Sequence, residues 1–143
     1  YVAAMMVSVI HKPTRAAGVV VSARSGCWST GLGIYVVGIT KSPIYSYSEW
    51  AFWCGDGVGH ATVWQEPTTV GNVDWAAGLL GWRYNGNMSG SPNARNMVWH
   101  AKNMTQGYFE YCPPRVFCIQ AQYPLVIING NYDGTFSGDV WPN

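Results

Sequence analysis

Carboxylates and histidines are the side chains that could do chemistry in this chain of 143 residues, which has seven acids and three histidines. Glu49 and Glu66 could supply the two carboxylates that flank the scissile bond in glycoside hydrolysis. His11, His60 and His100 lie far from one another and from the cysteines, so their spacing predicts neither a metal site nor a cofactor. No nucleophile or phosphate-binding motif accompanies them. The sequence therefore predicts a protein without catalytic activity, and a small secreted hydrolase remains one alternative.

The four cysteines are even in number, and none of them stands in CxxC spacing. This pattern favours two disulfides over a zinc site or a redox motif, and hence an oxidising, extracellular or cell-surface location. Four cysteines allow three pairings. We favour a bond between Cys112 and Cys118, which closes "CPPRVFC", together with a bond between Cys27 and Cys54 that clamps two longer elements.

Flat rings are concentrated in "YSYSEWAFWCGDGVGH", where five aromatic residues stand between Tyr45 and Trp53. Alternate side chains of a strand share a face, so Tyr45 and Tyr47 fall on one face. Because serines alternate with them, we expect these two rings at a half-wet surface. Trp53 precedes Cys54 and is expected to pack against a disulfide in the core. Trp50 is expected to meet a ligand.

The whole composition favours a sugar as that ligand, because eight Trp and nine Tyr stand beside loops rich in Asn, Ser and Asp. Binding sites combine an apolar wall with a few polar groups, and loops often carry them. Asp and Asn before Gly are also ordinary turn residues, which leaves a purely structural role open for each loop position. The candidate ligand-binding residues are Tyr45, Tyr47, Trp50, Asp56, Asn85, Asn87, Asn131 and Asp133.

Charge is scarce, at 10% of residues and a net +1, against about 25% charged residues in an average soluble protein. The basic residues are scattered, so nucleic acid is not an expected partner. The most apolar run, "YVAAMMVSVI", is shorter than the roughly 20 residues of a membrane-spanning helix. We expect a buried strand over residues 2–10 and no membrane insertion, and this segment could also support self-association.

Short apolar runs alternate with turn signals along the chain, which is typical of an all-β protein. Asn-Gly at 85–86 and at 129–130 is the strongest hairpin signal. Residues 73–82 could form a short helix, but two glycines argue against it. Strands are predicted over 3–10, 18–23, 34–40, 49–54, 60–66, 79–84, 96–101, 108–112, 116–121, 124–129 and 134–140. The expected fold is a single domain over 1–143, an antiparallel β-sandwich or jelly-roll-like domain stapled by disulfides.

The low charge and the segments "EWAFWC", "YCPPRVFC" and "DGTFSGDVWPN" carry a family resemblance. The chain resembles the receptor-binding lectin domain of bacterial chaperone–usher fimbrial tip adhesins. The resemblance implies an elongated, disulfide-stapled β-sandwich that binds a glycan or glycoprotein receptor without catalysis. It also implies a last strand that runs into a linker and a second, C-terminal domain. The alternative is a structural subunit of a pilus, filament or capsid, whose aromatic faces meet neighbouring copies.

Overall fold

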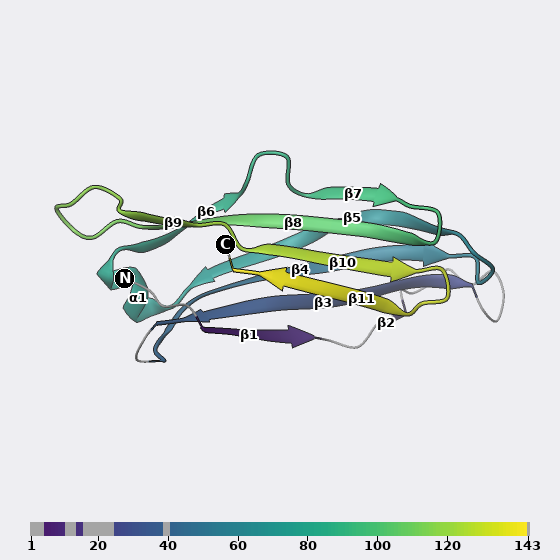
Figure 1. The fold of residues 1–143 in the computed structure, drawn as a ribbon, viewed down its shortest axis with the longest axis horizontal. Coiled ribbons are helices and arrows are strands. Elements are labelled where there is room, and N and C mark those ends of the chain that lie inside the picture. The colour runs from purple at the N-terminus through teal and green to yellow at the C-terminus, as the bar shows by residue number, and fades with distance from the viewer. Residues whose placement is uncertain (1–4, 11–13, 16–24, 39–40, 143) are drawn as a thin grey trace.

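The computed structural model describes residues 5–10, 14–15, 25–38 and 41–142, and this part of the chain is mostly β-strand (Figure 1). The elements are β1 (Met5–Ile10), β2 (Thr14–Arg15), β3 (Gly26–Val37), β4 (Pro43–Gly55), β5 (Ala61–Val73), α1 (Trp75–Leu80), β6 (Trp82–Asn87), β7 (Asn93–Asn96), β8 (His100–Tyr111), β9 (Gln120–Gln122), β10 (Leu125–Asn131) and β11 (Phe136–Trp141). The strand expected over residues 18–23 lies outside the described residues, as do His11 and the first residues of the apolar run.

The strands form two antiparallel sheets that stack face to face in an elongated sandwich (Figure 1). One sheet has the order β1-β3-β4-β5, and β2 also pairs with β3. The other has the order β11-β10-β8-β6, and the short strands β7 and β9 also pair with β8. The predicted all-β, antiparallel sandwich is confirmed.

The core lies between the sheets and is built by alternation along the strands. On β4 the inward positions 45, 47, 49, 51 and 53 are all buried. The ring of Tyr45 stacks on Phe109 of the opposite sheet, with 3.9 Å between ring centroids. Trp53 is fully buried, as predicted, and its Nε1 donates to the carbonyl oxygen of Asn131 at 2.9 Å. These rings hold the two sheets together.

Both disulfides have the pairing that the sequence favoured. Cys27 and Cys54 are bonded across the directly paired strands β3 and β4. Cys112 and Cys118 are bonded across the loop between β8 and β9. Two disulfides are typical of proteins that reside in an oxidising, extracellular-type environment.

The expectation against a helix in residues 73–82 is wrong, because α1 forms there with a cap at each end. Asp74 is the N-cap, and its carboxylate accepts a hydrogen bond from the backbone N–H of Ala76 at 3.1 Å. Gly81 ends the helix in the left-handed conformation, with φ of 116°. One of the two glycines is therefore a helix terminator. No helix of the described residues is long and apolar enough to cross a membrane.

Two expected hairpin turns and three expected strands are also corrected. The strand expected over 79–84 begins only at Trp82, because α1 runs to Leu80, and the strand expected over 96–101 is interrupted between Asn96 of β7 and His100 of β8. Asn85–Gly86 lies inside β6, where the pairing register with β8 shifts, and Asn129–Gly130 lies inside β10. Gly130 faces the core at a point where the ring of Trp53 leaves no room for a side chain. A Cβ on residue 130 would lie 2.1 Å from a ring carbon of Trp53. Residues 116–119 belong to the loop between β8 and β9, and strand β9 begins only at Gln120.

Candidate functional site

The outer face of the β3–β4–β5 sheet carries an open groove of about 360 Å³. It lies over the side of the sheet that faces away from the core. The side chains that point outward along its length alternate with buried ones, as the pleat of a strand requires. The outward-pointing residues of the groove are Gly31, Gly33, Tyr35, Ser46, Ser48, Trp50, Thr68 and Val70.

Cross-strand pairing arranges these residues in rows. In the first row Trp50 pairs with Gly31 on one side and with Thr68 on the other. Two residues along, Ser48 stands between Gly33 and Val70, and in the next row Ser46 pairs with Tyr35. The middle row thus has only small side chains on β3 and β4, so it forms the floor of the groove.

The indole of Trp50 lies flat against β3 because Gly31 has no side chain. A Cβ on Gly31 would lie 2.0 Å from Cε3 of Trp50, inside the ring's contact distance. Trp50 is 38% exposed, so one part of the indole rests on the sheet and another faces solvent. This arrangement leaves part of the indole of Trp50 exposed at the groove.

A second ring stands at the far end of the groove. Tyr35 is 49% exposed and pairs with Ser46, four residues along β4 from Trp50. At the rise of a strand this offset corresponds to about 13 Å. Hydroxyl groups of Ser46, Ser48 and Thr68 lie between or beside the two rings. Among the residues that the structure describes, none of the side chains that point outward into the groove is charged.

Glu49, also in β4, points into the core and is 1% exposed. Burial raises its pKa to about 9, and nearby Thr105 offsets this only in part. Neither carboxyl oxygen has a hydrogen-bond partner of good geometry among the described residues. Glu49 is therefore neutral at physiological pH. It does not form a surface pair with Glu66, which is exposed on β5.

Tyr45 and Tyr47 lie in the core, and the expectation of a half-wet surface for them is wrong. Their alternation with serines arises because 46 and 48 face outward while 45 and 47 face inward. The Tyr45 hydroxyl donates to Oε1 of Gln122 at 2.6 Å, and burial raises its pKa. The Tyr47 hydroxyl donates to Oδ1 of Asn87 at 2.7 Å, and burial raises its pKa to about 12.

The other expected contacts lie outside the groove. Asp56, Asn131 and Asp133 lie at the end formed by the β4–β5 and β10–β11 turns, which meet where the N–H of Gly57 donates to the carbonyl of Tyr132 at 3.1 Å. Asn85 and Asn87 are exposed on β6. The eight candidates therefore do not form one site: Tyr47 and Asn87 are hydrogen-bonded to each other, and Trp50 is the candidate whose side chain points outward into the groove.

The acids among them are occupied in turns. Oδ1 of Asp56 accepts backbone N–H groups of residues 58, 59 and 60 at 2.8–3.0 Å, and these bonds lower its pKa. Oδ1 of Asp133 accepts the backbone N–H of Thr135 at 3.1 Å and its hydroxyl at 2.6 Å, which lowers the pKa of Asp133. Both side chains therefore hold turns in shape.

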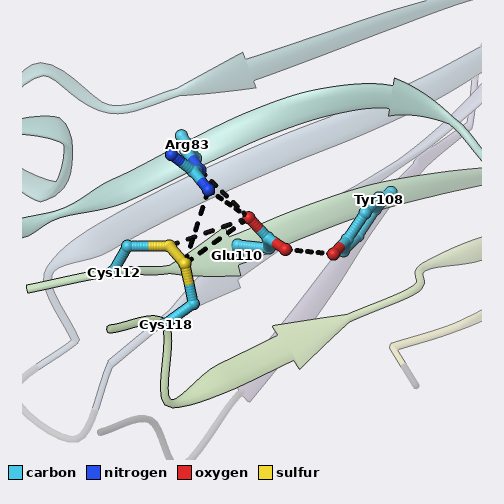
Figure 2. The surroundings of a disulfide bond; sticks show 5 residues. All are labelled: Arg83, Tyr108, Glu110, Cys112 and Cys118. Carbon is cyan, nitrogen blue, oxygen red and sulfur yellow. Dashed lines mark hydrogen bonds and ion pairs between the residues drawn. A yellow bond between two sulfur atoms is a disulfide. The ribbon is translucent and has the colours of Figure 1, made fainter. Parts of the chain in front are cut away.

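Figure 2 shows a polar network at the disulfide of the β8–β9 loop. Arg83 donates to Oε2 of Glu110 at 2.7 Å and to Sγ of Cys118 at 3.4 Å, and the Tyr108 hydroxyl donates to Oε1 of Glu110. The hydrogen bond from Tyr108, followed by that from Arg83, lowers the pKa of Glu110 to about 2. Among the described residues, Glu110, Cys112 and Cys118 place potential metal-ligand atoms within 4.8 Å of one another, but both sulfurs are in the disulfide.

The two ends of the sandwich also expose large apolar side chains, which no pattern in the sequence indicated as a surface. Phe117, in the disulfide-closed loop, is 83% exposed. One end carries Trp75, Leu79 and Leu80 of α1 with Val116, Phe117 and Ile119 of the β8–β9 loop, and the opposite end carries Val58, Met97, Val98 and Trp99 (Figure 1). We call these the helix end and the turn end.

Comparison with known proteins finds no matching family model, no similar curated protein and no similar solved structure.

The residues of the groove were missed for an identifiable reason. The even-numbered positions of "YSYSEW" share a face with Trp50, so the serines mark the outward face of the strand and the tyrosines mark the inward face.

Proposed function

We propose that this chain is a non-catalytic, secreted or cell-surface carbohydrate-binding domain of the lectin or adhesin type, and that it binds neutral glycans in the groove on β3, β4 and β5. The observation that carries the proposal is the indole of Trp50, laid on Gly31 beside a floor lined by hydroxyl groups and free of charged side chains.

This chemistry suits a sugar better than other small ligands. A pyranose ring has an apolar face of C–H groups that can stack on an indole, and its hydroxyl groups can exchange hydrogen bonds with Ser46, Ser48 and Thr68. A charged ligand would leave its charge unpaired in this groove, which favours neutral sugars. The two disulfides agree with function outside the cell.

The groove changes which residues are expected to hold the sugar. Asp56 and Asp133 were candidates as loop contacts, but their carboxylates bond to their own turns. The polar contacts of the proposed site are instead the outward-facing hydroxyl groups of β4 and β5.

A glycan array with the purified chain, followed by titration of the best hit, tests the proposal. Trp50→Ala should weaken binding by about tenfold or more, equivalent to about 1.4 kcal/mol. Trp99→Ala is the matched control, because that indole is also exposed but lies at the turn end. Binding that is unchanged in the Trp50 variant, or an array without any hit, would refute the proposal.

A second candidate is a structural subunit of a pilus, filament or capsid, and the apolar helix end and turn end favour it. Because the two patches are different surfaces at opposite ends, contact between them would be head-to-tail and would build an open chain of copies. Sedimentation velocity over a range of concentrations tests this: assembly that Phe117→Ser abolishes supports it, and a monomer at every concentration contradicts it.

A further inference from the structure

The groove has two aromatic rings, and the distance between them sets the length of a ligand that can contact both. Trp50 and Tyr35 lie on neighbouring strands, two rows apart in the cross-strand register, with the row of Gly33 and Ser48 between them. The offset along the strands is about 13 Å, which exceeds the width of one sugar ring lying on one aromatic platform.

The middle row is open because its residues are small. Gly33 has no side chain, and a Cβ there would lie 3.1 Å from Cβ of Ser48, so even an alanine would crowd this row. A ligand that bridges the two rings can therefore pass close to the backbone of the sheet at Gly33. The neighbouring β5 contributes Val70, which is 66% exposed and forms an apolar side of the groove.

We infer that the groove binds an extended, neutral oligosaccharide that lies along the strands, with one sugar unit on Trp50, a later unit on Tyr35 and the intervening part over Gly33 and Ser48. This inference rests on the proposed carbohydrate-binding function and specifies its ligand class. The site recognises internal units of a chain from the side, because the groove is open on the sheet face and no charged side chain among the described residues points into it to mark a terminal sugar.

The direction of the groove favours β-1,4-linked chains. A strand of a sheet is nearly straight over four residues, and a straight ligand can keep contact with both rings. An α-1,4-linked chain is curved and would lift away from one ring. Acidic oligosaccharides would meet no counter-charge from the outward-pointing side chains.

Titration calorimetry with β-1,4-linked gluco- and manno-oligosaccharides, from monosaccharide to hexasaccharide, tests the inference. Affinity should rise by about tenfold or more between the monosaccharide and the shortest chain that spans both rings, and then level off. Tyr35→Ala should remove this gain and weaken the binding of long chains far more than that of the monosaccharide, whereas Trp50→Ala should weaken every member of the series.

A block in the middle row gives an independent readout. Ser48→Leu places a bulky side chain between the rings and should reduce binding of long chains to the level of the monosaccharide. Circular dichroism and non-reducing mass analysis show whether each variant is folded and oxidised, and Trp99→Ala again serves as the control for exposed rings.

The outcomes separate this inference from the proposed function. A monosaccharide that binds as tightly as the hexasaccharide, together with Tyr35→Ala at wild-type affinity, overturns the extended-chain inference and leaves the carbohydrate-binding proposal standing. Equal affinity for α- and β-1,4-linked series overturns the linkage preference. Absence of binding to every oligosaccharide and to a broad glycan array overturns both.

Discussion

Glu49 of β4 faces Thr105 of β8 across the core of the sandwich, and both side chains are almost completely buried. A carboxyl group in this position keeps its proton because burial penalises the charged form. Its pKa in the folded protein is about 9, against 4.5 for an unperturbed glutamate. The core is therefore built around a neutral acid.

Stability should consequently fall as the pH rises. Below about pH 4.5 both the folded and the unfolded chain carry the proton, whereas between about pH 4.5 and pH 9 only the folded chain retains it. Glu49 therefore contributes stability that is fully present at the acidic limit and is lost towards the alkaline limit, on the order of a few kcal/mol across the window. Urea unfolding at several pH values within this window measures the slope.

Glu49→Gln should flatten this pH dependence, because an amide does not titrate. Glu66→Gln, a change at an exposed position of β5, is the control and should leave the slope as it is. A wild-type slope that persists in the Glu49 variant would mean that other groups cause it.

The sequence was sufficient for the fold class because the alternation of side chains along a strand and the number and spacing of the cysteines are local signals. Cysteine number and spacing favoured the observed disulfides, and the Trp53–Cys54 pair correctly indicated the core. The long strand β3 was recognised only in its second half, since residues 26–33 contain three glycines, which are poor strand formers. Gly31 leaves room for the indole of Trp50 from the neighbouring strand, and Gly33 leaves the groove open beside Ser48.

The candidate site was harder to predict because it depends on which strands are neighbours. Tyr35, Trp50 and Val70 come from three strands, and only the register brings them to one face. The Asn129–Gly130 signal failed for a related reason. Gly130 is required by the ring of Trp53 from the opposite sheet, which is a tertiary contact that no local pattern contains.

Gly130→Ala should destabilise the protein by about 1–3 kcal/mol, because the new Cβ would lie 2.1 Å from Cδ2 of Trp53 and the ring would have to move. Gly78→Ala is a matched control within α1, where the nearest atom to the new Cβ is Cγ1 of Val73 at 3.8 Å. That change should stabilise the protein by about 0.5–1 kcal/mol through helix propensity. Chemical denaturation of both variants measures the difference. Equal stability of the two would contradict the packing around Trp53.

The two disulfides should contribute unequally to stability. Cross-linking restricts the unfolded chain more when the closed loop is longer, and the bonded cysteines are 27 and 6 residues apart in sequence. The chain-entropy relation gives about 3.5 kcal/mol for Cys27–Cys54 and about 2.2 kcal/mol for Cys112–Cys118. Replacing each pair by alanines and measuring unfolding in denaturant tests this order. A larger loss from the short loop would show that the network of Arg83 and Glu110 depends on that bond.

A substitution at Asp56 distinguishes sugar binding in the groove from sugar binding at the loops, which the sequence suggested. Asp56→Ala removes an acceptor of three backbone N–H groups, so it should lower the melting temperature. It should leave glycan affinity within twofold of wild type, because Asp56 lies at the turn end and outside the groove. The measurements are a thermal melt and titration with the best array ligand, and Asp133→Ala should behave in the same way. Loss of glycan binding in either variant at full stability would place the sugar at the turns and not on β3, β4 and β5.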